Sequence, residues 1–501
     1  MFNTTLLISI IILLAAPLII FIIGNWNADV AKWLAFAATL IAGVFFALTL
    51  GDVLNLGIHE ESWPWMDFIV GSINFKISFS LIADNLSFPI VAIIFILSLA
   101  AVMYSFSYMK EEKNLGVYYA LLVLYIAGMV GVVLAGDLVQ FYIFWELMLI
   151  PSYFIIAQWG SKPNSVKIAF KYFIFTHIGA MAILAGIGGL WAYGSPDGSF
   201  TIATLDMSST PAIAIRLLTI LFLVGFSVKM AIFPIHSWLP DTHSEAPTPI
   251  SAILSGVMIE TAAYGILRIC TGVIGEPGMG GWMRWVLIGL AVFTMMYGGI
   301  MALAQKDTKR LFAYSSISQM GYIFFGLGTF TMFGSTGSMF HIVSHALAKG
   351  TLFMVAGILM TQIGHHKGRN IEKLGGLGLK MPITAIVAMI AALSLAGTPP
   401  LAGFMSEWII FQGGLQANST LGIIAVIFAI LSTALTATYV LLFLKNVFLG
   451  PVKEEYEDIT DPSPYMWVPL AIIAILSFVV GIFPNTVLTF VTEVVAKIFG
   501  A

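Results

Sequence analysis

The chain has 501 residues, of which 59% are apolar and only 9% are charged. An average soluble protein carries about 25% charged residues, so this chain lacks the polar surface that a water-soluble globule needs. Its net charge of −3 provides no basic footprint for nucleic acid, and the single cysteine, Cys270, excludes disulfide scaffolds and iron–sulfur clusters held by this chain alone.

Apolar runs of about 20 residues recur along the chain, and each is long enough to cross a hydrocarbon core about 30 Å thick. The first run lacks the basic segment and the cleavage site of a signal peptide, so we expect it to be retained. The sequence predicts an all-α polytopic membrane protein with about fourteen helices, near 5–23, 30–49, 82–105, 117–135, 138–158, 168–193, 213–236, 249–271, 284–304, 311–330, 338–361, 382–415, 420–447 and 466–490.

Fourteen spans divide most of the basic residues unequally between the two faces of the membrane. The larger group contains Lys32, Lys110, Lys113, Lys162, Lys167, Lys171, Lys306, Lys309, Arg310, Lys367, Arg369, Lys373, Lys380, Lys445 and Lys453. The smaller group contains Lys76, Arg216, Arg268, Arg284 and Lys497. Cytoplasmic loops carry an excess of Lys and Arg, so we predict that the first face is cytoplasmic and that both termini are outside.

Two of the predicted spans are interrupted by proline. These are FSVKMAIFPIHSWLPDTHSEAPTPIS at 226–251 and LSLAGTPPLAGFMSEWIIF at 393–411. Proline removes a backbone donor, and freed backbone is tolerated at membrane depth only where protein or a watery cavity covers it. Two broken helices that lie five helices apart are typical of transporters built from inverted repeats, with a site at the breaks.

Several ionisable residues lie inside the predicted spans. Each costs about 2.5–3.5 kcal/mol at the bilayer centre, so each needs a reason to be there. A static ion pair between helices is the alternative for any one of them, and a hydrogen-bonded structural histidine is the alternative for His341. Their number favours a proton relay, whose candidate residues are Glu146, Lys229, Glu260, His341, His345, Lys349 and Glu407. Asp137 and Arg268 lie near helix ends and are interpreted as interfacial.

Other kinds of chemistry find no support in the sequence. His365 and His366 are adjacent in a loop, and neither HExxH nor CxxC occurs. There is no GxGxxG or GxxxxGK[ST] placed after a strand and before a helix. If a redox reaction drives this protein, its cofactors are expected in other subunits.

The runs FYIFWELMLIPSYFII, FSVKMAIFPIHSWLPDTHSEAPTPISAILSG and QKDTKRLFAYSSISQMGY resemble the antiporter-like membrane subunits of complex I. The resemblance covers essentially the whole chain. Glu407 in GFMSEW favours the chain M (subunit 4) branch of that family, because the sister subunits tend to carry lysine there.

The resemblance implies two inverted five-helix repeats with helices 7 and 12 broken. The implied units are N-terminal helices at 1–110, repeats at 111–275 and 276–450, and a C-terminal loop and helix at 451–501. By motif, Glu146 would pair with Lys229, the input-side proton carrier, and modulate its pKa. His345 and Lys349 would form the central connection, and Glu407 would be the output residue.

Two positions depart from the family pattern. Glu260 stands where the helix-8 motif usually carries lysine, and Gln319 replaces a histidine of the helix-10 motif SxSHxG. Gln cannot carry a proton as an ionised intermediate. We therefore expect the middle of the relay to depend on Glu260, His345 and water, with Glu260 also able to contact Lys229.

The resemblance also implies partners. We expect other membrane subunits of a complex I-like assembly, a peripheral redox arm that holds iron–sulfur clusters and flavin, and surrounding lipid, in an energy-transducing membrane, most simply a prokaryotic cell membrane. No cofactor or metal is expected in this chain. The alternatives are a subunit of a multisubunit Na⁺/H⁺ antiporter or membrane-bound hydrogenase, and a scaffold whose charges are static ion pairs.

Overall fold

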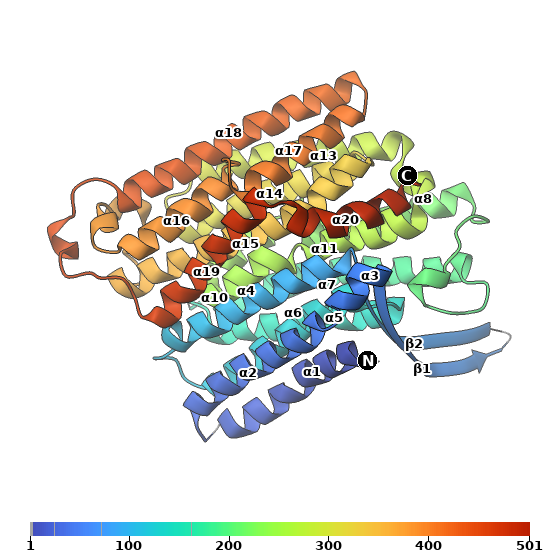
Figure 1. Ribbon diagram of the computed structural model, residues 1–501, viewed down its shortest axis with the longest axis horizontal. Helices are drawn as coiled ribbons and strands as arrows, with labels where there is room; N and C mark the ends of the chain where they lie inside the picture. The colour runs from blue at the N-terminus through green and yellow to red at the C-terminus, as the bar shows by residue number, and fades with distance from the viewer. Residues whose placement is uncertain (1–3, 25, 72, 162, 501) are drawn as a thin grey trace.

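The computed structural model describes residues 4–24, 26–71, 73–161 and 163–500, so the predicted cytoplasmic Lys162 lies outside the described residues. Long helices run side by side through this part of the chain, and a two-stranded sheet projects from one end of the bundle (Figure 1). Both termini lie toward the end that carries the sheet, as an even number of spans requires (Figure 1).

The elements of the first half are α1 (Thr5–Gly24), α2 (Ala28–Ala47), α3 (Leu50–Leu56), β1 (Ile58–Val70), β2 (Ile73–Asp84), α4 (Ser87–Tyr108), α5 (Leu115–Leu134), α6 (Leu138–Trp159), α7 (Ser165–Gly194), α8 (Ala212–Lys229), α9 (Trp238–Glu245), α10 (Thr248–Ile253) and α11 (Thr261–Gly265). Two π-helical segments, η2 (Leu254–Met258) and η3 (Ile266–Ile274), flank α11.

The second half contains α12 (Glu276–Met279), α13 (Gly281–Leu303), α14 (Thr308–Gly328), α15 (Met332–Ile363), α16 (Pro382–Leu395), α17 (Ala402–Gln416), α18 (Thr420–Phe448), α19 (Pro464–Ile482) and α20 (Asn485–Ile498). Helix α15 lies in the middle of the bundle, where Gly334–Met360 is buried without interruption (Figure 1). Its central place explains why a 32-residue helix with two histidines and a lysine is buried all round.

The polytopic membrane fold is confirmed. In the described residues, twelve helices are long and apolar enough to cross a membrane. The two further spans that the sequence predicts correspond to the more polar helix α14 and to the interrupted pair α16 and α17. These two elements carry part of the buried polar network described below.

The sheet was not predicted, because a search for long apolar runs passes over strands. Strands β1 and β2 pair as an antiparallel hairpin with Trp63 opposite Phe79, and they continue to Asp84, inside the range predicted as the start of a membrane helix. The carboxylate of Glu61 on β1 accepts hydrogen bonds from the backbone N–H groups of Leu6 and Leu7, at 2.8 and 2.9 Å. The hairpin thus caps the start of α1.

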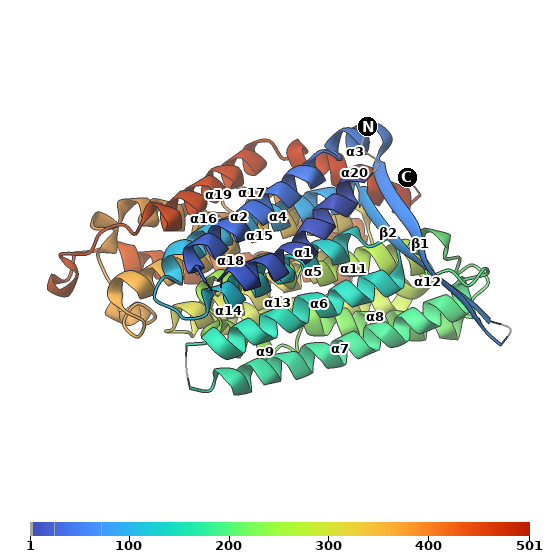
Figure 2. The ribbon, with the colours of Figure 1, turned by 90° about the horizontal axis from the view of Figure 1, so that it is seen from below.

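The last predicted span also differs from the structure. Its range, 466–490, covers two helices, because α19 ends at Ile482 before Pro484 and α20 starts at Asn485. Helix α20 packs on α15, α4 and α19 (Figure 2). Proline ends the first helix because it cannot continue the backbone ladder.

A buried ion pair joins the hairpin to the core. Arg268, on η3, lies 2.7 Å from the carboxylate of Asp84 and donates a further hydrogen bond to the Tyr264 hydroxyl at 3.0 Å. The same carboxylate caps α4 by accepting from the N–H of Ser87. Arg268 is therefore held by two partners with about 20% of its side chain exposed, and Asp137 is a fully buried N-cap of α6.

We predict that Arg268→Gln lowers the free energy of unfolding by about 3 kcal/mol. Removal of the guanidinium leaves the Asp84 carboxylate buried without the positive charge that pairs with it. The measurement is the midpoint temperature of heat unfolding of the purified protein. Lys497→Gln, which breaks an exposed ion pair with Glu493, should change it little and is the control. Equal midpoints for both variants would contradict the prediction.

Candidate functional site

The first helix break follows Lys229, the last residue of α8. Side chains replace the lost helical hydrogen bonds there: the Trp238 indole donates to the carbonyl of Val228 at 3.0 Å, and the N–H of Phe233 donates to Thr294 at 3.2 Å. Freed backbone at membrane depth needs such partners. The start of the break is therefore covered by protein, with Lys229 and Ala231 buried, whereas Pro234 and Ser237 further along it are exposed.

The second break lies between α16 and α17. Gly397 adopts a φ of +65°, which side chains other than glycine rarely accept, and a Cβ there would lie 2.7 Å from Oε2 of Glu407. The carboxylate of Glu407 thus packs directly on the unwound backbone. Lys229 and Glu407 are both adjacent to a break, as the sequence predicts.

Lys229 and Glu146 do not form the expected ion pair in the described residues. Nζ of Lys229 lies 5.3 Å from the ring centre of Trp145, a cation–π contact, and its side chain is almost completely buried. Glu146 instead lies 3.2 Å from Nδ1 of His177 on α7. Trp145 and Glu146 are neighbours in sequence on α6, so consecutive residues of one helix contact Lys229 and His177.

The middle of the site is a direct contact between Glu260 and His345. Oε1 of Glu260, at the turn between η2 and α11, hydrogen-bonds Nδ1 of His345 on α15. Both side chains are fully buried. The contact between Glu260 and Lys229 that the sequence analysis allowed does not occur in the described part of the chain. The π-helical turns that flank Glu260 are of a kind found often at functional sites.

His341 bridges two neighbouring helices. Its ring nitrogens hydrogen-bond Gln319 on α14 and Ser406 on α17, both at 2.9 Å. The rings of His341 and His345 are 6.1 Å apart on one face of α15. Gln319, which departs from the family motif on α14, thus serves as a hydrogen-bond partner of His341. Ser406, the other partner, directly precedes Glu407 in the chain.

Lys349 has hydroxyl and carbonyl partners in place of a carboxylate. Its Nζ donates to Ser315 at 2.6 Å and to the carbonyl of Phe312 at 3.1 Å. Ser315 in turn hydrogen-bonds the hydroxyl of Tyr439 on α18 at 2.7 Å. The lysine is therefore held by α14 and has no ion-pair partner in the part of the chain that the structure describes.

Glu407 ends the buried series. Its Oε2 accepts from the hydroxyl of Thr433 on α18 at 2.8 Å, and Thr433 also contacts the Tyr322 hydroxyl at 3.0 Å. The other carboxylate oxygen has no protein partner in the described residues, and the same holds for Oε2 of Glu260 and Nε2 of His345. Buried polar atoms of this kind bind water in proteins.

The sequence analysis missed several members of this network. His177 lies in the middle of a predicted span and could have been found by the same test as the other ionisable residues. Ser406, Thr433 and Tyr439 carry no such signal, because hydroxyl residues are common in membrane helices. Their partners become visible only when the helices are packed.

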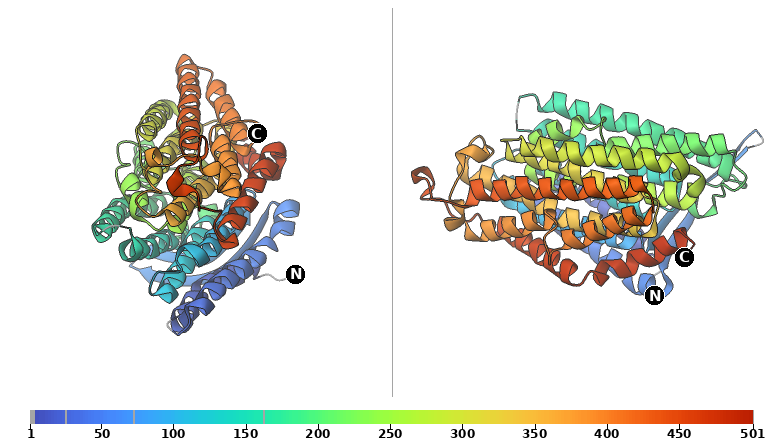
Figure 3. Two further views of the ribbon diagram at one scale, coloured as in Figure 1. Left: turned by 90° about the vertical axis from the view of Figure 1, so that its left-hand side faces the viewer. Right: turned by 90° about the horizontal axis from the view of Figure 1, so that it is seen from above.

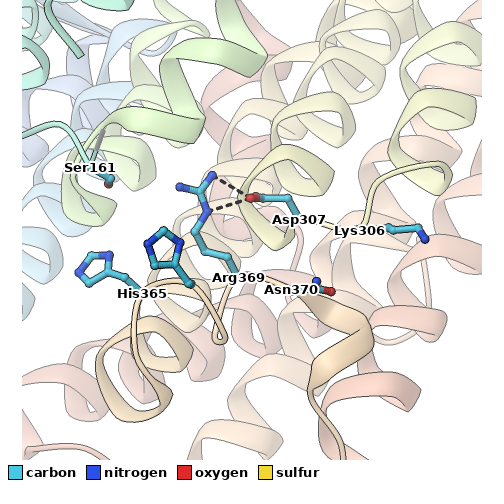
Figure 4. Close-up of a pocket in the computed structure, with 7 residues that line it drawn as sticks. Ser161, Lys306, Asp307, His365, Arg369 and Asn370 are labelled. Carbon is cyan, nitrogen blue, oxygen red and sulfur yellow. Dashed lines mark hydrogen bonds and ion pairs between the residues drawn. The ribbon is translucent and has the colours of Figure 1, made fainter. Parts of the chain in front are cut away.

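A separate polar pocket of about 300 Å³ opens between loops at one end of the bundle (Figure 4). It contains the adjacent pair His365 and His366. Nε and Nη2 of Arg369, on the same loop, both lie 2.8 Å from one carboxylate oxygen, Oδ2, of Asp307, the N-cap of α14 (Figure 4). Burial and the nearby cations Lys309 and Arg369 lower the pKa of His365. The pocket adds no metal site, since no group of three or more metal-ligating side chains occurs in the described residues.

Comparisons with known proteins find similar membrane subunits. The family described as NADH:quinone oxidoreductase/Mrp antiporter, TM, matches residues 135–433, and a family described as NADH-ubiquinone oxidoreductase (complex I), chain 5 N-terminus, matches residues 65–119. The first match covers more than half of the chain, including both breaks and every candidate residue named above.

Two curated relatives cover most of both chains. F(420)H(2) dehydrogenase subunit M of Methanosarcina mazei is 32% identical over 444 residues, which are 85% of this chain and 84% of the relative. NADH-quinone oxidoreductase subunit M of Rickettsia prowazekii is 30% identical over 484 residues, 96% of each chain. A Na(+)/H(+) antiporter protein from Alkalihalophilus pseudofirmus is 33% identical over 90% of this chain but only 58% of its own length.

Solved structures share the fold. A chain of the membrane-bound sulfane sulfur reductase, an archaeal respiratory membrane complex, has a TM-score of 0.82 at 29% identity and covers 96% of this chain and 77% of its own. A chain of respiratory complex I from Thermus thermophilus has a TM-score of 0.84 at 22% identity and covers 99% and 100%.

We predict that His341 positions its neighbours and that His345 is the histidine that carries protons. His341→Gln keeps a polar group between Gln319 and Ser406 and should retain most proton movement, whereas His341→Phe should cost about 1–3 kcal/mol of stability by leaving buried polar groups unpaired. His345→Gln should abolish proton movement. Heat unfolding and proton uptake in vesicles measure the two effects; loss of uptake in a stable His341→Gln variant would contradict this assignment.

Proposed function

Because the chain belongs to the NADH:quinone oxidoreductase/Mrp antiporter family of membrane subunits, we propose that it is the proton-translocating subunit of a complex I-like respiratory dehydrogenase. Electron transfer would take place in other subunits, which carry the iron–sulfur clusters and flavin. The observation that carries the proposal is the contact between Glu260 and His345. It joins two titratable groups from separate helices between the two breaks.

We propose three relay steps, of which the contact between Glu260 and His345 is the second. Lys229 accepts a proton on the input side. Glu146, which contacts His177, changes the affinity of Lys229 for that proton through the charge of its carboxylate. Glu260 and His345 pass the proton between the halves of the bundle, with Lys349 one helical turn further along α15. Glu407 releases it, since Thr433 leaves one of its carboxylate oxygens free to be protonated.

Magnitudes explain why several groups are needed. Movement of one proton against about 150 mV costs roughly 3.5 kcal/mol, or a change of about 2.5 pKa units at the carrier. One charge brought to about 10 Å at an effective dielectric constant near 20 supplies only about 1.7 kcal/mol. Changes in burial and hydration must supply the rest. A series of nearly buried titratable groups provides both the interaction between charges and the changes in burial and hydration.

Two internal repeats, at 111–275 and 276–450, are part of the proposal, with 1–110 and 451–501 as flanking units. Matching local features support them. Asp137 caps α6 in the first unit, and Asp307 caps α14 in the second. Each unit also contains one broken helix with a titratable residue beside the break. The cytoplasmic position of the larger basic group and the outward termini remain predictions.

A Na⁺/H⁺ antiporter subunit without a redox partner is the second candidate, and its support is the antiporter relative described above. Purification of the native assembly distinguishes the two. Companions with iron–sulfur, flavin or nickel–iron centres support the respiratory proposal and identify the electron donor. Proton movement that requires Na⁺, in an assembly without redox proteins, supports the antiporter. If the chain is only a scaffold, removal of its buried charges should destabilise the assembly and should have no separate effect on transport.

We expect Lys229→Ala and Glu146→Gln each to abolish most proton translocation while assembly survives, because the first removes the proton carrier and the second removes the charge that tunes it. Proton pumping by vesicles that contain the purified complex is the measurement, and subunit content is the assembly check. Lys497→Ala, at an exposed position, is the control. Normal pumping by both relay variants would refute the proposal.

Glu260→Gln tests the middle of the relay. Glutamine keeps the size of the side chain and a hydrogen bond to His345, but it cannot accept and release a proton. Proton pumping should therefore fall at least about tenfold while the unfolding temperature stays close to that of the native protein. Full pumping in this variant would show that protons bypass Glu260.

A further inference from the structure

A long apolar groove lies between α16, α18 and the loops beside their ends. Its volume is about 570 Å³, and every side chain that lines it is apolar or glycine. Helices α16 and α18 lie next to each other on the outside of the bundle, with α18 at its edge (Figures 1 and 3). Ile386 and Met389 on α16 and Leu441 on α18 are largely exposed. The groove therefore faces the surroundings of the protein.

The length of the groove matches one leaflet of a bilayer. Along α16 the lining runs from Pro382 to Leu393, which spans about 16 Å at 1.5 Å per residue. Half of a hydrocarbon core about 30 Å thick is about 15 Å. Since Pro382 is the first residue of α16, the helical part of the groove begins at the end of the helix and extends over a length equal to about half of a hydrocarbon core.

Two lysines flank the outer end of the groove. Lys380 lies two residues before Pro382, and Lys445 shares a helix face with the lining residues Leu441 and Phe448. Lys445 is exposed, and neither lysine has a side-chain hydrogen bond or ion pair in the described part of the chain. Both belong to the basic face that the sequence predicts to be cytoplasmic. Two lysines without a side-chain partner in the described residues thus lie near the outer end of the apolar groove, where we expect lipid headgroups.

We propose that this groove binds an anionic phospholipid of the same leaflet, with its phosphate between Lys380 and Lys445 and one acyl chain against α16 and α18. Basic pockets between membrane helices on the cytoplasmic side recognise anionic headgroups, and the leaflet there is negatively charged. A helix of a partner protein is the alternative occupant, and the cross-linking experiment below distinguishes it from a lipid.

The inner end of the groove touches the second helix break. The carbonyl of Leu393, the last lining residue of α16, accepts a hydrogen bond from the N–H of Thr398 at 3.1 Å. Thr398 lies in the unwound segment that packs on Glu407. The bound acyl chain therefore supports the helix end from which the break starts.

The test uses the purified native assembly in mild detergent, stripped of lipid and titrated with phosphatidylglycerol or phosphatidylcholine while bound lipids are counted by native mass spectrometry. Lys380→Gln with Lys445→Gln should bind phosphatidylglycerol about 30-fold more weakly. Binding of phosphatidylcholine should change little. The matched control is Lys110→Gln with Lys113→Gln, two exposed lysines of the same predicted face that lie outside the groove.

A second variant separates the tail from the headgroup. Ala385→Phe fills the groove and leaves both lysines in place, so it should release either lipid. Unchanged phosphatidylglycerol binding in both the lysine and the phenylalanine variants would overturn the proposal. A cross-link from an Ile386→Cys variant to another protein subunit would also overturn it, since a partner would then occupy the groove. Neither result bears on Lys229, so the proposed function is tested separately.

Discussion

A polar group inside hydrocarbon must find its partner within the protein, and the architecture of this chain depends on that requirement. It explains why the backbone at the first break is met by the indole of Trp238 and the hydroxyl of Thr294. It also explains why α15, with its two histidines and its lysine, lies at the centre of the bundle. Most of the functional candidates meet this requirement with other titratable or hydroxyl groups, whereas Lys229 meets it with the ring of Trp145.

Hydroxyl side chains are the partners of several buried titratable groups. Ser406 links His341 to the segment of Glu407, Thr433 holds the Glu407 carboxylate, and Ser315 holds Lys349 against Tyr439. Hydroxyls both donate and accept, so each can keep its neighbour satisfied in either protonation state. A fixed ion pair has no such freedom, because it stabilises one charge state only. The partners found here suit groups that change protonation.

Sequence reasoning succeeded where the signal was local. Long apolar runs located the membrane helices, and prolines marked both breaks. It failed at the hairpin, because the search was for long apolar runs and strands do not form such runs. It also failed at Glu146, whose observed partner is His177 on α7 in place of Lys229. The pairing of Glu260 with His345 was expected only in outline, since the contact depends on how α11 and α15 pack.

The sequence by itself determined that the chain is a polytopic membrane protein with interrupted helices and ionisable residues at membrane depth. These are consequences of composition and spacing within single segments of about 20 residues. Only the tertiary structure decided which groups meet. Glu260 and His345 are 85 positions apart, and His341 and Ser406 are 65 apart, so helix packing alone brings them together. Partner choice is a property of neighbouring helices, and no single helix encodes it.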